Sequence, residues 1–355
     1  MATTSRATTS RQKTAQVEQK TAQVEQQAAQ IQSTAVTIRL FGTPDYEAVV
    51  AVNNAVFPDR PSTPEEWRYD DEHFEKKYVN ERYVAAQPGS GEILGFAGFW
   101  HVPWAYHPRK FGMEVRVHPL LRRQGIGTAL WREVEDRLRG RRAISVKTQI
   151  WEAMPEGLAF ASRAGFREVM RAWESRLDVA GFDLRAFRPQ LDRALAGGME
   201  VTTLAAEREK GSDALRRLHA MEAEIAEDVP RPSDDVHTPV SFEMWMEHVV
   251  EAPWAIPEAY FIAVVGGEYA GVSSLFRPQI GDWLNQGLTG VRRTHRGRGI
   301  ATALKVRTVQ YGRDHDVREI RTWNEINNQR MLAINGKFGF VRQPAWLTFQ
   351  KEFGE

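Results

Sequence analysis

One short motif occurs twice in this chain of 355 residues, at a constant offset. The segment 122–127 reads RRQGIG and the segment 296–301 reads RGRGIA, so the two copies lie 174 residues apart (299 − 125). The same offset relates Gly165-Phe166 to Gly339-Phe340, which lie well downstream of the motif. An alignment of this length without a gap predicts one strand, loop and helix built twice. The chain is therefore expected to be a tandem duplication.

The duplication sets the expected domain organisation. A length of 355 residues fits two domains of about 150 to 170 residues each. We expect a first domain at 35–186, a linker at 187–198 that contains Pro189 and Gly197-Gly198, and a second domain at 199–355. Residues 1–34 are low-complexity and rich in Thr, Ser and Gln, with a heptad-like repeat. A mostly disordered tail is the main interpretation of that segment, and a weak oligomerising helix is the alternative.

The two halves show the same alternation of strand-like and helix-like segments. In the first half strands are expected at 36–40, 83–86, 94–99 and 143–148, with helices at 45–57, 65–78 and 156–163. Another helix is expected directly after the loop, with Leu130, Val134 and Leu138 on its apolar face. In the second half strands are expected at 201–204, 260–265, 269–276 and 319–323, with helices at 214–225, 301–313 and 328–337. A last strand follows Phe166 in the first half. The fold class is thus α+β, with two tandem domains that each form a twisted mixed sheet flanked by helices.

Composition excludes several classes of function. The chain has no cysteine, so a disulfide, a thiolate metal site and a cysteine nucleophile are excluded. No His or Glu/His pair has metal-ligand spacing, so no metal is expected. A formal net charge of +1 gives no reason to expect a nucleic-acid partner. No apolar run is long enough for a membrane span and the N-terminus has no apolar signal core, so we expect a cytoplasmic enzyme.

The repeated loop has a chemistry of its own. In the pattern Arg-x-x-Gly-x-Gly/Ala between a strand and a helix, glycine lets the backbone approach a ligand, and the helix N-terminus adds positive potential. Several N–H groups in one concavity bind phosphate, and pyrophosphate especially well. A dinucleotide fingerprint would need a third glycine where Leu130 and Thr302 stand, and a Walker loop would need Gly-Lys-Ser/Thr. A tight turn without a ligand is the structural alternative, which two occurrences in one context disfavour.

The order of these elements around the loop resembles the GNAT acetyltransferase superfamily, twice over, from residue 36 to 355. The second half is similar to tandem members of the mycothiol synthase type, through Thr322-Trp323-Asn324, Asn328, Met331-Leu332 and Gly339-Phe340. The resemblance implies acyl transfer from acetyl-CoA to a primary amine, by direct attack within a ternary complex. It implies cofactor contacts from Val291, Arg296, Gly297, Arg298, Gly299, Ile300, Ala301 and Asn328, and in the first half from Val117, Arg122, Arg123, Gln124, Gly125, Ile126 and Gly127.

The chain departs from the family at two positions. The tyrosine that protonates the departing thiolate in many members is replaced by Ala161 and Asn335. The asparagine seven residues earlier is kept as Asn328 but is Met154 in the first half. The second half is therefore the expected catalyst, with the first a structural or cofactor-retaining partner. Two alternatives stay open: activity in both halves or only in the first, and an acyl-CoA-binding regulatory or structural protein without turnover.

The acceptor side depends on carboxylates and aromatic rings. An attacking amine must lose a proton, and Glu222, Asp228 and Glu114 are the candidate bases. Glu222 and Asp228 belong to an acidic group in the second half, and Glu114 lies beside the first motif strand. The acidic group of the second half is Glu222, Glu224, Glu227, Asp228, Asp234 and Asp235, and that of the first half is Glu65, Glu66, Asp70, Asp71 and Glu72. A solvated helix face is the alternative for each group.

Tryptophans add a second sign of an acceptor site, since 11 of them in one chain is a high number. Trp100, Trp104 and Tyr106 follow the first hairpin, and Trp254 and Trp283 flank the second. They predict either an aromatic acceptor pocket or core packing. The expected acceptor is a small-molecule amine of unspecified identity, and the protein a monomer or homodimer.

Overall fold

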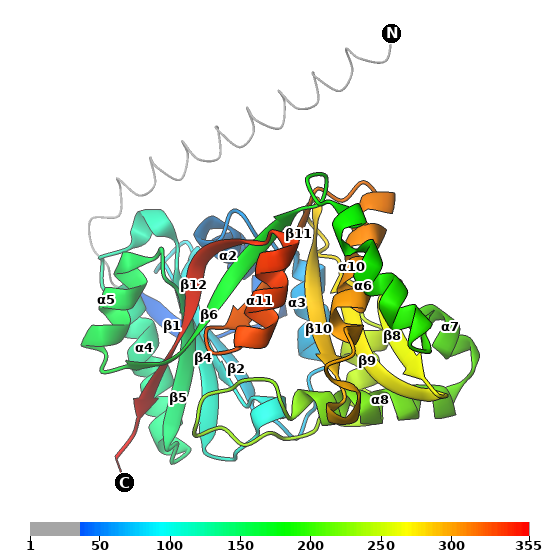
Figure 1. Cartoon of the computed structure of the whole chain (residues 1–355). Helices are drawn as coiled ribbons and strands as arrows, with labels where there is room; N and C mark the ends of the chain where they lie inside the picture. Colours follow the sequence, from blue (N-terminus) through cyan, green and yellow to red (C-terminus); the bar gives the residue numbers. More distant parts are fainter. Residues whose placement is uncertain (1–35, 355) are drawn as a thin grey trace. The chain divides into compact units, whose positions relative to one another are not determined.

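The computed structural model describes residues 36–354, so the predicted tail lies outside the described residues (Figure 1). The described chain divides into two compact units. The first holds residues 36–59, Glu81–Gly98 and Val115–Leu138, and the second holds Arg60–Asn80, Phe99–Glu114 and 139–354. The units do not follow the sequence repeat, because segments of the first repeat belong to the second unit.

The first unit is built from the opening strands of the first repeat and its motif helix. It contains β1 (Thr37–Leu40), α2 (Tyr46–Val56), most of β2 (Asn80–Ala86) and β3 (Ile93–Trp100), the end of β4 (Lys110–Val117) and α4 (Ile126–Gly140). β1 pairs antiparallel with β2, from Thr37 opposite Ala86 to Leu40 opposite Tyr83. In α4 the buried residues Ile126, Leu130, Val134 and Leu138 recur at helical spacing, as the apolar pattern predicts.

The second unit holds a larger mixed sheet. Its strands lie in the order β4-β5-β12-β6-β11-β10-β9-β8-β7, where only the start of β4 belongs to the unit. Their bounds are β5 Ser145–Trp151, β6 Arg167–Asp178, β7 Met199–Thr203, β8 Ala255–Val265, β9 Glu268–Phe276, β10 Trp283–Val291, β11 Glu319–Glu325 and β12 Val341–Glu352. The helices are α3 Pro64–Glu72, α5 Pro155–Arg163, α6 Leu184–Ala196, α7 Leu204–Glu209, α8 Ser212–Ala226, α9 Phe242–Trp245, α10 Ile300–Asp314 and α11 Gln329–Phe338, with a π-helical turn at Met246–Val250.

The sequence offset is kept by whole elements. β5 and β11, β6 and β12, and α4 and α10 are each separated by 174 residues (319 − 145, 341 − 167 and 300 − 126). The duplication is therefore a duplication of structure, and the predicted α+β class with a mixed sheet flanked by helices is confirmed.

The last strands of the two repeats are exchanged, which the sequence did not indicate. β6 of the first repeat pairs with β11 of the second, and β12 of the second pairs with β5 of the first. β6 and β12 also pair with each other, antiparallel (Figure 1). The exchange leaves neither strand as a free edge, and it couples the repeats through backbone hydrogen bonds.

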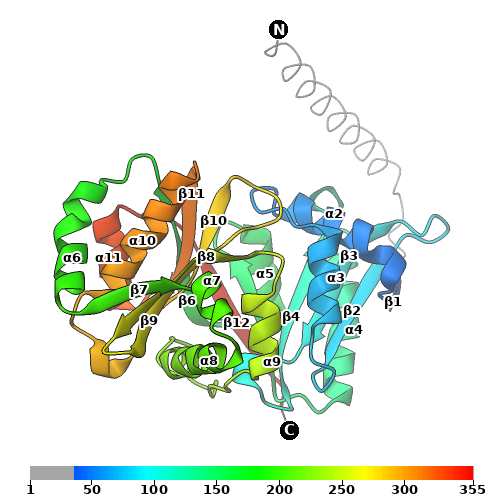
Figure 2. The ribbon, with the colours of Figure 1, turned by 90° about the vertical axis from the view of Figure 1, so that its right-hand side faces the viewer.

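Helices cover both faces of the second unit's sheet. One core lies under α6 and α10 and includes Leu191, Leu284, Leu304 and Ile320. The other lies under α7 and α8 and includes Leu218 and Trp245 (Figure 2, where α7, α8 and α9 are grouped). Residues next to each other along β10 or β11 therefore face different helices.

Two expected boundaries differ from the structure. Most of the segment 187–198, expected as a linker, lies in α6, whose Leu191 and Ala194 are buried in the α10 core. The charged helix expected at 65–78 ends at Glu72. None of the helices in the described part of the chain is long and apolar enough to cross a membrane.

Candidate functional site

Both copies of the glycine loop have left-handed backbone at matching positions. Gly297 and Gly299 have φ of 79° and 77°, and in the first copy Arg123 and Gly125 have φ of 65° and 86°. Gly299 is the N-cap of α10, so the first N–H groups of the helix point away from the helix without a partner inside it. A Cβ at Gly125, Gly297 or Gly299 would meet nothing within 4 Å, so the loop is open on that side. An open loop with unpaired N–H groups is the geometry that fits a pyrophosphate.

The strand that leads into the second loop separates from its parallel neighbour. β10 and β11 pair only from Trp283–Asn285 to Glu319–Arg321, and β10 then carries an irregularity between Gln286 and Thr289 on its β9 side. The first repeat has the same short pairing, Lys110–Gly112 with Ser145–Lys147. Beyond these three residues the β10 backbone up to Val291 is not paired with β11. Backbone groups there can bind the amides of a cofactor arm, which the resemblance implied for Val291.

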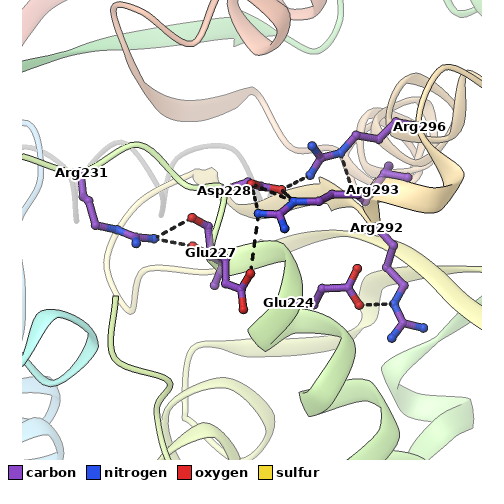
Figure 3. Close-up of polar contacts among 9 residues, drawn as sticks. Glu224, Glu227, Asp228, Arg231, Arg292, Arg293 and Arg296 are labelled. Carbon is purple, nitrogen blue, oxygen red and sulfur yellow. Dashed lines mark hydrogen bonds and ion pairs between the residues drawn. The ribbon is translucent and has the colours of Figure 1, made fainter. Parts of the chain in front are cut away.

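An ion-pair cluster surrounds the start of the second loop (Figure 3). Asp228 forms ion pairs with Arg296 and with Arg293, the latter at 2.7 Å between Oδ1 and Nη2. Arg296 also donates from Nε to the Val291 carbonyl at 3.0 Å. The hydrogen bonds from Arg293 and Arg296 lower the pKa of Asp228 to about 2. A carboxylate with that pKa has little affinity for a proton near neutral pH, which argues against Asp228 as the general base. It orients the loop arginine instead.

Glu222 has the opposite character. It lies in α8, where its Oε2 accepts the indole N–H of Trp245 at 2.6 Å, while its buried Oε1 has no hydrogen-bond partner among the described residues. Burial raises the pKa of Glu222 to about 7, although the Trp245 bond acts in the other direction. One turn further along α8, Ile225 is close to Gly290 of β10, since a Cβ at Gly290 would come within 2.1 Å of it. A carboxyl of this pKa, one helical turn from the residue that contacts the separated strand, fits the general-base role.

The remaining acidic candidates are placed differently. Glu114 is half-buried near the end of β4 and stays a prediction. Asp234 bonds Lys110 at 2.9 Å and Lys147 at 2.8 Å, and Asp235 bonds Lys147 at 2.5 Å. Although partial burial acts to raise the pKa of Asp234, the two lysines lower it to about 2. These aspartates therefore form ion pairs on β4 and β5 of the first repeat rather than an open acidic groove.

The asparagines of the second half have structural partners. Asn328 is the N-cap of α11, and its Oδ1 accepts the Met331 N–H at 3.3 Å, so its amide nitrogen is the group that a cofactor could use. Asn335, at the position of the missing tyrosine, donates to Asn324 Oδ1 at 2.6 Å and is buried. An amide N–H is far too weak an acid to protonate a thiolate. In the first repeat the corresponding N-cap, Met154, makes no side-chain bond.

A pocket of about 340 Å³ lies in the second unit, on the face of β10 and β11 opposite α10. Leu284 and Ile320 point into the α10 core, so their neighbours point to the other side. The pocket is lined by Arg60, Pro61, Ser62, Glu66, Trp67, Asp70, Trp254, Phe276, Arg277, Pro278, Trp283, Asn285, Arg321 and Trp323. It brings together the predicted Trp254 and Trp283, but not Trp100, Trp104 or Tyr106. Glu66 and Asp70 belong to the acidic group of the first repeat. They line this pocket together with residues of the second repeat.

Sequence reasoning missed Trp67, Asn285, Arg321 and Trp323 as site residues. They are far apart in the chain, and only the two-residue side-chain period of a strand could have placed Arg321 and Trp323 on one face. Among the described residues no group of three or more His, Cys, Asp or Glu could hold a metal ion.

Comparison with known proteins agrees with this geometry. The model of the acetyltransferase (GNAT) family matches twice, at residues 47–166 and 220–340. A mycothiol acetyltransferase of Catenulispora acidiphila is 24% identical in an alignment of 258 positions that covers 67% of this chain and 71% of that protein. One of Pseudarthrobacter chlorophenolicus is 26% identical over 263 residues, 72% of this chain and 74% of that protein.

Solved structures show the same fold. A tandem GNAT protein from the clavulanic acid biosynthesis pathway has a TM-score of 0.71 at 20% identity, and covers 90% of this chain and 99% of its own. A GCN5-related N-acetyltransferase from Sphaerobacter thermophilus has a TM-score of 0.63 at 20% identity, covering 89% and 95%. The two family matches fall on the two repeats, so this chain belongs to the acetyltransferase (GNAT) family as a tandem member, and is an acetyl-CoA-dependent N-acetyltransferase.

Proposed function

We propose that the second repeat transfers the acetyl group of acetyl-CoA to the amine of a small molecule. The observation that carries this proposal is that β10 connects three features: the open loop at its end, the unpaired backbone beside β11, and the aromatic pocket at its start. The name of the mycothiol acetyltransferase relatives also favours a small-molecule acceptor. We expect the enzyme to act in the cytoplasm.

The residues around acetyl-CoA would act as follows. The loop 296–301 holds the pyrophosphate through backbone N–H groups, with Arg296 held by Asp228. The amine nitrogen attacks the thioester carbonyl, a carbon–nitrogen bond forms, and the carbon–sulfur bond breaks to release CoA as a thiolate. Glu222 accepts the proton that the amine loses. Water protonates the thiolate, since a thiol of pKa about 8.5 is a tolerable leaving group without an acid.

We propose a structural or cofactor-retaining role for the first repeat. Lys147 is the counterpart of Arg321 (321 − 147 = 174), and it is bonded to Asp234 and Asp235, whereas Arg321 lines the pocket. Met154 also stands where the second repeat has Asn328. Both observations favour the second repeat as the catalyst.

The proposal is tested by release of CoA thiol in the presence of acetyl-CoA and a panel of amines. Since the chain has no cysteine, a thiol reagent reports only the product. Glu222→Gln is expected to lower kcat/KM about 100-fold, the usual size of a general-base contribution. Because Glu222 must be ionised to act, wild-type activity should fall as pH drops through about 7, and this limb should be absent in the variant.

Asp213→Asn, an exposed carboxylate at the start of the same helix, is the matched control and should keep the wild-type rate. Glu222 is not the base if Glu222→Gln keeps both the rate and the acidic limb. The enzyme proposal itself fails if acetyl-CoA binds and no amine in the panel releases thiol.

A further inference from the structure

Half of the residues that line the pocket beside β10 are apolar, and most of these are aromatic. Seven of its fourteen lining residues are Trp, Phe or Pro, and four of these are tryptophans: Trp67, Trp254, Trp283 and Trp323. A volume of about 340 Å³ lies at the lower end of the range for small-molecule sites. Indole faces attract both flat apolar groups and ammonium groups. The small volume and the tryptophans in the lining therefore favour a compact ligand with an apolar body.

Asn285 supplies an unsatisfied acceptor in this pocket. It is the last residue of β10 that pairs with β11, so it lies where the two strands begin to separate. Its Oδ1 is buried and has no hydrogen-bond partner among the described residues. A buried acceptor without a partner destabilises a protein by about 1–3 kcal/mol, so a ligand that donates a hydrogen bond to it would remove this cost. An amine N–H at this point would supply one, next to the strand gap that is proposed for the thioester.

The charged side chains that line the pocket are mostly engaged by the protein itself. Arg60 pairs with Glu174 at 2.7 Å, and Arg321 pairs with Glu319 at 2.7 Å and lies 3.8 Å above the ring of Trp283.

Glu66 is engaged too, since its two oxygens accept the backbone N–H groups of Thr63 and Gln279, each at 3.0 Å. Asp70 is exposed at the rim, on the same helix as Trp67, where it favours an approaching cation. The lining thus offers few polar partners for a ligand with many hydroxyl groups.

We propose that this pocket binds an arylalkylamine, with the amine donating to Asn285 Oδ1 and the aromatic body against the tryptophans. The proposal rests on the proposed function, because it names the acceptor class of that same site. Trp67 comes from α3 of the first repeat, while Asn285 and Trp323 come from the second. The first repeat thereby contributes to acceptor specificity without catalysing transfer.

Two measurements test it, with phenethylamine and glucosamine as probes. Quenching of tryptophan fluorescence measures binding in the absence of acetyl-CoA, and thiol release measures turnover. We expect phenethylamine to bind and react with a kcat/KM at least about tenfold above that of glucosamine. Trp67→Ala and Asn285→Leu should each raise the KM for phenethylamine about tenfold, a value typical of a lost stacking or hydrogen-bond contact, with the KM for acetyl-CoA unchanged. Lys76→Ala, at an exposed position just after α3, should leave both values unchanged.

The outcomes separate this inference from the proposed function. Phenethylamine binding that Trp67→Ala weakens supports the pocket assignment even if no thiol is released, in which case only the proposed function fails. Preferred turnover of glucosamine overturns the inference and leaves the proposed function standing. The inference is also overturned if Trp67→Ala and Asn285→Leu both leave the KM for phenethylamine unchanged. A normal affinity for acetyl-CoA shows that the two variants are folded.

Discussion

Replacing Gly299 with glutamate is expected to abolish acetyl-CoA binding by the second repeat. The residue has φ of 77°, a left-handed backbone that costs a residue with a side chain roughly 1–2 kcal/mol. It is also the N-cap of α10, so a carboxylate there would sit where the pyrophosphate must bind and would repel it. Together the strain and the repulsion should raise the Kd at least about 100-fold, which corresponds to about 2.7 kcal/mol. Isothermal titration of acetyl-CoA into the purified chain measures the effect.

Two further variants make that result specific. Gly267→Glu introduces the same strain, with φ of 83° and open space around it, but lies in the turn between β8 and β9 and should bind normally. Gly125→Glu makes the equivalent change in the first loop. One binding site that only Gly299→Glu removes would support a working second repeat. Two sites, each lost with its own variant, would support cofactor retention by both repeats, and unchanged binding in Gly299→Glu would reject the loop assignment.

The local parts of this molecule were predictable from sequence. The glycine loop, the helix after it and the order of strands depend on residues close together in the chain, and the repeat provided a second copy of each. The apolar positions of α4 and the N-terminal start of α10 at the loop follow directly from helical spacing and glycine placement.

The long-range parts were not predictable, for a physical reason. The exchange of β6 and β12 leaves no trace in the sequence, because a strand that pairs along both edges keeps the same pattern of side chains beside either neighbour. The pocket brings Trp67 and Trp323 together from opposite ends of the chain, which no spacing rule connects. Two of the three candidate bases could not be ranked from the sequence either. Two arginines lower the pKa of Asp228, whereas burial raises the pKa of Glu222 against the opposing effect of its bond to Trp245.

Replacing the buried Lys305 with methionine is expected to stabilise the protein. Lys305 lies in α10 and is only 1% exposed; its Nζ is 3.4 Å from Gln286 Oε1 and 4.9 Å from the ring centre of Phe340. Burial lowers the pKa of its ammonium group to about 7. The first repeat has Trp131 at the equivalent position, 5% exposed, so the fold accepts an apolar side chain there.

The pH dependence follows from the direction of this shift. A lysine in the unfolded chain keeps its proton up to about pH 10.4, whereas Lys305 in the folded protein loses it above about 7. Between these values the unfolded state binds more protons, so the lysine destabilises the folded state most at or below pH 7 and progressively less toward pH 10. A shift of about three units corresponds to about 4 kcal/mol, and part of it is lost again in repacking, so we expect a gain of about 2–3 kcal/mol at pH 7.

Urea unfolding followed by tryptophan fluorescence at pH 7 and pH 10 measures this gain, which should nearly vanish at the higher pH. Lys337→Met, at an exposed position of α11, is the control and should change neither value. A gain that is equal at both pH values, or a loss of stability at pH 7, would contradict the assigned cause.

The same variant separates stability from function in the second repeat. Gln286 keeps the hydroxyl of Thr308 as a donor at 3.3 Å when Lys305 is removed, so no buried acceptor is left without a partner. Its amide also bonds Ser273 Oγ at 3.2 Å and the Ser274 carbonyl at 2.6 Å, which hold β10 to β9 at the irregularity before the loop. Because these bonds do not involve the lysine, acetyl-CoA affinity should stay within about twofold of wild type, a difference of about 0.4 kcal/mol. A more stable protein that has lost affinity or turnover would instead mean that the buried charge itself maintains the open strand pair.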